Sequence, residues 1–320
     1  MARAAHPASD AHGGVRAHSV ASDQVNEDAV ALRMDVGIVG LAGAGAILAR
    51  RWAGAGMRVA VFDRDGRAPH DHGRQRACAL PSAVAVARSL AAPRVVWLCV
   101  PAGAATELAM QDVWPELAAG DVIVDVGDAH HRDAPRRAAA LASVGIHFAD
   151  CGMRDTGDDA ATVLLGGSAE AARIVAPLAR IAAGKGVYAH CGSAGAGHYV
   201  RMVNDGVERA VLRAFDEGAA LLHGKREFGL DAAAIAGLLR AGRGATIWPA
   251  ERGEAHAAHL AGASGYCVVN EAVSLRTPAP VLSLAAMLEL GAVDLAAGAA
   301  RAAGPTQRPA GAADDKDDTT

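Results

Sequence analysis

The stretch GIVGLAGAGAILARRW, residues 37–52, joins an apolar run to a glycine-rich turn and then to an alanine- and leucine-rich segment. This order is typical of a β-strand, a tight turn and a helix. In a dinucleotide-binding fold the first glycine makes the turn, the second admits the pyrophosphate, and the third lets the helix pack on the strand. Gly40 and Gly45 occupy the first and third positions, whereas Ala42 stands at the second and directs its Cβ toward the pyrophosphate.

Apolar strand-like runs recur along the chain, with alanine-rich helical segments between them. These runs are VGIVGL (36–41), RVAVFD (58–63), RVVWLCV (94–100), DVIVDVG (121–127), GIHFADC (145–151) and ATVLLGG (161–167). Apolar strands that alternate with helices form a parallel sheet covered on both faces. After Gly197 the strand pattern ends, and the remaining sequence predicts helices.

The length of 320 residues, 52% of them hydrophobic, favours two domains of ~100–200 residues each. We expect a Rossmann-like domain over residues 34–193 and an all-helical domain over residues 194–300. Residues 1–33 are rich in Ala, His, Ser, Asp and Gly, and residues 301–320 end in DDKDDTT. Such compositions predict a disordered extension and a disordered tail.

Composition limits the partners and the compartment. The net charge is −4 with both signs interspersed, so neither nucleic acid nor a membrane is an expected partner. The cysteines, which lack a CxxC pair or a nearby His cluster, predict neither disulfides nor a metal site, and they favour a reducing cytoplasm. They are Cys78, Cys99, Cys151, Cys191 and Cys267. A small molecule and a second copy of the chain are the expected partners.

Asp63 follows the glycine-rich turn by about twenty residues, where dinucleotide folds place an acid beside the ribose. A carboxylate there accepts hydrogen bonds from the ribose diol and repels a 2′-phosphate, which favours NAD. Arg64 either stacks on adenine or binds that phosphate, so NADP is the alternative. A turn without a ligand, in a chain rich in Ala and Gly, is the other interpretation of the whole motif.

Further motifs follow in an order that resembles a known family. They are VWLCVPAG (96–103), VDVGDAHHRDAPRR (124–137), GIHFADCG (145–152), HCGSAGAGHYVRMVNDGVE (190–208), EFGLD (227–231), SGY (264–266) and TPAPVLS (277–283). Their order and spacing are similar to those of the short-form 6-phosphogluconate dehydrogenases in the β-hydroxyacid dehydrogenase superfamily. This resemblance implies a Rossmann-like NAD(P)-binding domain, an all-α C-terminal domain, and a cytoplasmic homo-oligomer.

Motif and resemblance together predict the cofactor site. The expected cofactor-binding residues are Gly40, Leu41, Ala42, Gly43, Gly45, Asp63, Arg64, Val100, Pro101, Ala102 and Asp128. The resemblance also implies a reaction of the pentose phosphate pathway. A hydride leaves C3 of 6-phosphogluconate, a lysine takes the hydroxyl proton, carbon dioxide is lost, and a glutamate protonates the enediol to give ribulose 5-phosphate, without a metal.

The stretch HYVRMVNDGVE, residues 198–208, matches the family's catalytic helix with substitutions. The lysine position is Arg201, the following His-Asn pair is Asn204-Asp205, and Glu208 keeps the identity of the acid. The resemblance therefore places catalysis at Arg201, Asp205 and Glu208. It places substrate binding at Asp128, His198, Asn204 and Asp205.

Other motifs depart from the family pattern. Asp128 replaces an asparagine that contacts both cofactor and substrate. After Gly152 a Ser-Gly-Gly substrate loop is replaced by the shorter MRDTGDD, and an arginine that holds the substrate phosphate corresponds to Thr246. A Gly-Glu-Gly-Arg-Trp segment expected after SGY is absent from the sequence. The phosphate end of the site therefore has fewer donors.

These substitutions change the expected chemistry. Arginine, with a pKa above ~12, cannot act as the base, although it can stabilise an alkoxide or pair with Asp205 four residues on. His198 either supplies a replacement base, since an ordinary histidine pKa is ~6.5, or lines the helix start. His130 and His131 are expected to be a surface pair. A stripe of Val200, Val203, Val207, Val211 and Ala214 is expected to be core packing.

Three functions therefore remain open. The first is oxidative decarboxylation of 6-phosphogluconate with NAD or NADP. The second is a catalytically impaired paralogue that acts as a cofactor-binding or regulatory subunit, because the lysine base is missing. The third is a dehydrogenase for another β-hydroxyacid, in which Arg201 and the altered loop bind a carboxylate.

Overall fold

A computed structural model describes residues 18–19, 36–67, 76–157, 159–224, 226–231, 234–235 and 264–288. The chain divides into two compact units, residues 1–207 with 251–268 and residues 208–250 with 269–320. Most of the expected extension over 1–33, the position of Thr246 and the expected tail over 301–320 lie outside the described residues.

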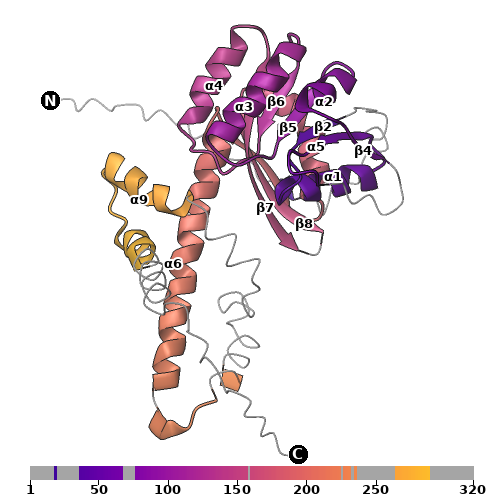
Figure 1. Ribbon diagram of the computed structural model, residues 1–320. Coiled ribbons are helices and arrows are strands. Elements are labelled where there is room, and N and C mark those ends of the chain that lie inside the picture. Colours follow the sequence, from indigo (N-terminus) through magenta and orange to yellow (C-terminus); the bar gives the residue numbers. More distant parts are fainter. Residues whose placement is uncertain are drawn as a thin grey trace, which may run out of the picture. The chain divides into compact units, whose positions relative to one another are not determined.

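Within the described residues, the first unit contains a nine-stranded sheet (Figure 1). The strands are β1 (His18–Ser19), β2 (Val36–Val39), β3 (Val59–Phe62), β4 (Ala77–Ala79), β5 (Val95–Leu98), β6 (Val122–Asp125), β7 (His147–Gly157), β8 (Ala160–Gly167) and β9 (Val187–Gly192). Their order is β1-β9-β8-β7-β6-β5-β2-β3-β4, and the strands from β4 through β7 are parallel. The predicted Rossmann-like fold is confirmed by this order, which places the topological switch point between β2 and β5.

The expected parallel sheet is wrong at two pairs. β1 pairs antiparallel with β9, and β7 pairs antiparallel with β8, with Cys151 opposite Leu165. The chain between Gly157 and Ala160 is too short for a crossover, so it can join only neighbouring antiparallel strands. The hairpin occupies the segment in which the family resemblance predicts a Ser-Gly-Gly loop.

Helices cover both faces of the sheet. They are α1 (Ala44–Gly54), α2 (Ala83–Ser89), α3 (Ala104–Val113), the short 3₁₀ helix η2 (Trp114–Glu116), α4 (Asp133–Ala142) and α5 (Ala169–Ala183). The buried side chains of α1 and α5 join one core cluster, and those of α2, α3 and α4 join the other. Strands β2, β5 and β6 are buried throughout, as apolar strands between two helical layers must be.

Every described element after β9 is helical, as the sequence predicts. These elements are α6 (Ala196–Gly224), the 3₁₀ helix η3 (Arg226–Phe228), α9 (Ser264–Ser274) and a final helical segment over 280–288. The two compact units divide within α6, after Val207. The expected domain boundary between residues 193 and 194 stays a prediction. Among the described helices, none is long and apolar enough to cross a membrane.

The expected core stripe of α6 is wrong. Val200, Val207 and Val211 are 37%, 46% and 45% exposed. Over residues 196–214 of α6, where side-chain burial is described, the buried side chains are instead His198, Met202, Asp205, Arg209, Ala210 and Leu212. The polar stripe of this helix therefore faces protein, which requires each buried charge to have a partner.

Candidate active site

The carboxyl ends of β2 and β5 meet at the switch point because residue 40 is a glycine. This residue has a φ of 97°, and a Cβ there would collide with the carbonyl oxygen of Cys99 at the end of β5. A Cβ at Gly45 would likewise collide with the carbonyl oxygen of Gly40. Both positions therefore require glycine for the close approach that the dinucleotide motif predicts.

The first turn of α1 is open to an anion. Its N-cap, Gly43, has a φ of 51°, and a Cβ there would meet no atom within 4 Å. Ala42 and Gly43 are exposed, and the first turn of the helix contains no acidic residue. The free amides and positive dipole of a helix N-terminus favour a pyrophosphate. The turn therefore fits a dinucleotide, although Ala42 takes the place of the second glycine.

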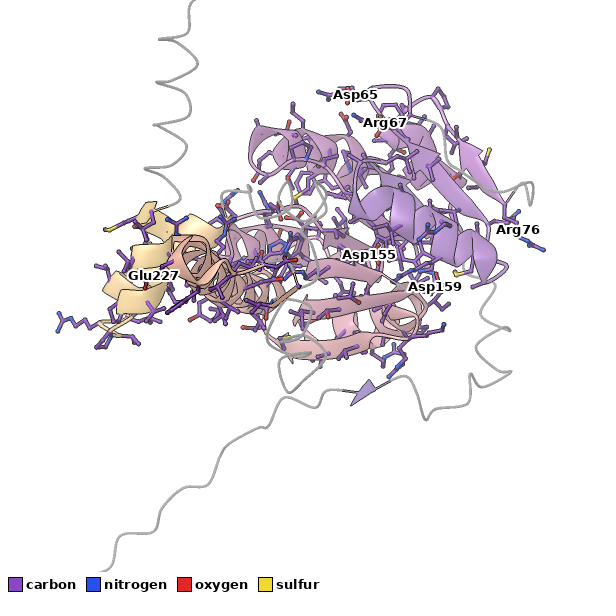
Figure 2. All side chains as sticks on the ribbon, turned by 90° about the horizontal axis from the view of Figure 1, so that it is seen from below. Asp65, Arg67, Arg76, Asp155, Asp159 and Glu227 are labelled. Atoms are coloured by element: carbon purple, nitrogen blue, oxygen red, sulfur yellow. The ribbon has the colours of Figure 1, made fainter. Side chains whose placement is uncertain are left out.

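Asp63 lies just beyond β3 and is tied to the same turn. Its carboxylate accepts the Leu41 amide at 2.7 Å and the Asp65 amide at 3.0 Å. Burial would raise the pKa of Asp63, but the amides of Leu41, Arg67 and Asp65 and the charge of Arg67 together lower it. Arg67 also pairs with Asp65 at 2.7 Å (Figure 2), whereas Arg64 is exposed. The predicted ribose acceptor is thus a fixed anion.

Beside this edge lies a pocket of about 340 Å³, formed within the first compact unit. It is lined by Ala102, Gly103, Gly127, Asp128, Ala129, His130, His131, Asp133, His198, Arg201, Met202 and Cys267. These residues come from the start of α3, from the β6–α4 turn, from α6 and from α9. The pocket therefore brings Ala102 and Asp128, predicted for the cofactor, together with His198 and Arg201, predicted for the substrate and catalysis.

Four side chains of alternating charge run from the pocket into the protein; we call them the charge ladder. Arg201 is 2.6 Å from Asp128 and 3.5 Å from Asp205, measured between guanidinium nitrogen and carboxylate oxygen. Asp205 lies 3.7 Å from Arg154 of β7. The expected Arg201–Asp205 pair is present, but the shortest contact of Arg201 is to Asp128. Sequence reasoning missed Arg154, which lies in the segment that replaces the family's substrate loop.

Asp150 of β7 holds the beginning of α6. Its buried carboxylate accepts the amide of Gly195 at 2.6 Å and the amide of His198 at 2.8 Å. The strand and helix approach closely because Gly152 and Gly197 lack side chains; a Cβ at Gly152 would meet the Gly197 carbonyl oxygen at 2.6 Å. Asp150 thus satisfies two helix amides that would otherwise be buried without an acceptor.

The ring of His198 lies in the pocket wall beside Arg201. Its Nδ1 is 4.0 Å from Oδ2 of Asp150, and neither ring nitrogen has a hydrogen-bond partner although both are buried. Both sequence interpretations of His198 therefore have a structural counterpart, since the backbone lies at the helix start and the imidazole lines the pocket.

The turn that carries Asp128 is anchored from behind by a buried ion pair. Asp125, the last residue of β6, accepts the amide of Gly127 at 3.0 Å and the guanidinium of Arg137 at 2.6 Å. Arg137 also reaches Glu107 of α3 at 3.0 Å. Burial raises the pKa of Asp125 above its ordinary value, despite the opposing charges of His198 and Arg137. This pair joins β6, α3 and α4 beneath the pocket.

The remaining sequence-predicted site residues have different surroundings. Asn204 is exposed and does not line the pocket. Glu208, seven residues after Arg201 on α6, is the first residue of the second compact unit. His130 and His131, expected to be a surface pair, line the pocket with their rings 4.5 Å apart. Across the described ranges, no group of three His, Cys, Asp or Glu residues is placed to hold a metal.

Comparison with known proteins identifies the family. Residues 35–192 match the NAD-binding domain of 6-phosphogluconate dehydrogenase. The NAD⁺-dependent decarboxylating 6-phosphogluconate dehydrogenase of Haloferax volcanii is 31% identical over 265 residues, which cover 78% of this chain and 87% of that protein.

Two solved structures share the fold. The 6-phosphogluconate dehydrogenase of Plasmodium falciparum gives a TM-score of 0.68 at 18% identity, covering 88% of this chain and 67% of that one. The 3-hydroxyisobutyrate dehydrogenase of Mycobacterium tuberculosis gives 0.63 at 20% identity, covering 80% and 92%. The match to the NAD-binding domain and the 31% identity to the Haloferax volcanii enzyme show that the α/β domain binds NAD(P), and the chain belongs to the 6-phosphogluconate dehydrogenase family.

Proposed function

We propose that this chain is an NAD-dependent dehydrogenase of a β-hydroxyacid that lacks a phosphate, and that it oxidises 6-phosphogluconate only slowly. The single observation that carries the proposal is the 2.6 Å contact between Arg201 and Asp128 in the pocket. This contact shows a guanidinium that binds a carboxylate inside the pocket. The family resemblance places the catalytic base at this same position, so the change from lysine to Arg201 bears on which substrate is bound.

A guanidinium is suited to hold a carboxylate because it is planar, remains charged, and donates in a fork that matches two carboxylate oxygens. Asp128 is 45% exposed, so water competes for its side of the pair. A substrate carboxylate that enters the pocket takes the place of Asp128 on Arg201. In this proposal Arg201 binds and orients the substrate and stabilises negative charge on its oxygen.

The charge of the site disfavours 6-phosphogluconate. That substrate carries a carboxylate and a phosphate, about three negative charges in all. The charge ladder has two cations and two anions, and Asp133 adds a further anion to the pocket wall. The family resemblance also places Thr246 where a phosphate-binding arginine is expected. A β-hydroxyacid with one carboxylate brings a single negative charge into the pocket, so it is repelled less by Asp128, Asp133 and Asp205.

A turnover assay tests the proposal. NAD and NADP are each supplied with 3-hydroxyisobutyrate, L-serine or 6-phosphogluconate. We expect NAD to be preferred, because Asp63 repels a 2′-phosphate, and a phosphate-free acid to exceed 6-phosphogluconate at least tenfold in kcat/KM. Arg201→Gln should raise KM at least tenfold, and Arg136→Gln, an exposed arginine outside the pocket, should not. If 6-phosphogluconate is the best substrate, the proposal is wrong.

The loss of the family's lysine favours a second candidate, a cofactor-binding or regulatory subunit. The same experiment separates the two. Tight NAD binding in calorimetry, with no oxidation of any of the three acids, would support the regulatory candidate and contradict a dehydrogenase.

A further inference from the structure

We infer that His198 is the group that takes the proton from the substrate hydroxyl, in place of the family's lysine. This inference rests on the proposed dehydrogenase function. It deepens that function by naming a base where the sequence has Arg201.

The position of His198 suits this role. Its side chain is 3% exposed, it lines the pocket, and it stands three residues before Arg201, so both project from the same face of α6. Both ring nitrogens are buried without a hydrogen-bond partner. A buried imidazole without a partner costs free energy, so its retention in a pocket wall indicates a ligand that completes it.

Two buried carboxylates interact electrostatically with the His198 ring. Asp150 lies 4.0 Å from Nδ1, and the charge of His198 lowers the pKa of the buried Asp125, so two carboxylates attract an imidazolium. Arg201 opposes this attraction, but Asp128 and Asp205 neutralise it. The other titratable groups of the pocket wall are His130, His131, Asp133 and Cys267. The balance resembles a histidine base supported by a carboxylate.

Two other pocket groups are poorer bases. The Nδ1 atom of His130 accepts the amide of Arg132 at 3.2 Å. Burial raises the pKa of the Cys267 thiol, which disfavours the thiolate. Neither ring nitrogen of His198 has such a contact.

The step balances without a metal. Gly40, Gly45 and Asp63 would hold NAD⁺, which would supply the acceptor for the hydride and its two electrons as the C–H bond of the hydroxyl-bearing carbon breaks. The O–H bond breaks at the same carbon, its electron pair forms the carbonyl, and His198 takes the proton at Nε2. Nδ1 faces Asp150, which stabilises the imidazolium until the proton passes to water. Arg201 holds the substrate carboxylate during this transfer.

Kinetics of His198→Gln test the inference, with His147→Gln as the control, because His147 at the start of β7 does not line the pocket. We expect His198→Gln to lower kcat at least a hundredfold, as loss of a general base does, with KM and NAD affinity changed less than threefold. His147→Gln should change kcat less than threefold. Adding Arg201→Lys to His198→Gln should recover at least tenfold, because lysine can act as the base.

A second readout needs no turnover. A base must contact the substrate hydroxyl, so NMR signals of the His198 ring, identified by their loss in His198→Gln, should shift at constant pH when 3-hydroxyisobutyrate is added in the presence of NADH. Unshifted signals, or wild-type kcat in His198→Gln, overturn this inference alone. A wild-type chain that oxidises none of the three acids overturns the proposed function and this inference with it.

Discussion

Asp128→Asn should strengthen the binding of a carboxylate substrate. The substitution restores the amide that the family has at this position, removes the carboxylate that occupies Arg201 at 2.6 Å, and changes the side-chain volume little. The substitution therefore tests the effect of the negative charge of Asp128 while the shape of the side chain stays nearly the same. The expected direction is opposite to that of most pocket substitutions, which weaken binding.

The magnitude follows from the charges. Two unit charges ~4 Å apart interact by ~4 kcal/mol at an effective dielectric constant of 20. Asp128 is 45% exposed, and screening reduces such pairs to ~1 kcal/mol. Because ~1.4 kcal/mol corresponds to a tenfold change in affinity, Asp128→Asn should lower the Kd of the carboxylate about fivefold.

The assay is calorimetric titration of 3-hydroxyisobutyrate in the presence of NADH, which allows binding without oxidation. Asp133→Asn is the control, since Asp133 lines the same pocket, is 43% exposed, and lies 4.0 Å from Arg136 and Arg137. The gain in Asp128→Asn should shrink as salt is added. An unchanged or weaker affinity in Asp128→Asn would refute the reasoning. An equal gain in Asp133→Asn would show that the affinity depends on the net charge of the pocket and not on the contact between Asp128 and Arg201.

Three further predictions concern stability and cofactor choice. Asp150→Ala should lower the free energy of unfolding by ~3–5 kcal/mol in urea titration, because two buried amides lose a charged acceptor; a loss under 1 kcal/mol would contradict the capping role. Arg137→Leu should cost ~3–5 kcal/mol by leaving Asp125 unpaired, and adding Asp125→Leu should recover most of that loss. Asp63→Asn should lower the ratio of NADP to NAD dissociation constants at least fivefold in fluorescence titration, and an unchanged ratio would remove Asp63 as the selective group.

The α/β fold could be predicted because its signal is local. The runs that form β2, β5 and β6 are apolar throughout, which happens only when both faces of a strand are covered. The strands β1, β4 and β9 were not predicted, and β1 lies in the segment 1–33 that was expected to be disordered. β4 has three residues, and β9 includes His190 and Cys191, so neither has a long apolar run. The antiparallel direction of β8 follows from the short turn between β7 and β8, and the pattern of apolar residues in the strands carries no information about strand direction.

The cofactor turn was easier to predict than the rest of the site. Gly40 and Gly45 lie in one short motif whose geometry is fixed by backbone contacts, so spacing alone identifies them. Arg154 lies far from Asp205 along the sequence, and nothing in the local pattern pairs them. Asp150 had a usable signal that sequence reasoning passed over. A carboxylate inside the apolar run GIHFADC must find buried donors, and these are the first amides of α6.

The inverted orientation of α6 has a physical cause. Apolar periodicity predicts the buried face when burial is driven by transfer from water, which holds for ordinary core helices. In α6 the buried face is instead fixed by hydrogen bonds and ion pairs from His198 to Asp205, leaving Val200 and Val207 exposed. In a helix such as α6, whose polar residues line a pocket, the hydrophobic pattern therefore does not predict which face is buried.

The charges that the substitutions introduce are paired within the charge ladder. Relative to the family pattern, Asp128 and Asp205 each replace a neutral asparagine with an anion, and Arg154 adds a cation in the replaced loop. Changes that accumulate without constraint would leave some of these charges without a counter-ion, at a cost of several kcal/mol for each buried one. Every one of them instead lies within 3.7 Å of an opposite charge. The substitutions therefore form a set of paired charges around Arg201, and this pairing supports the proposal of a changed substrate.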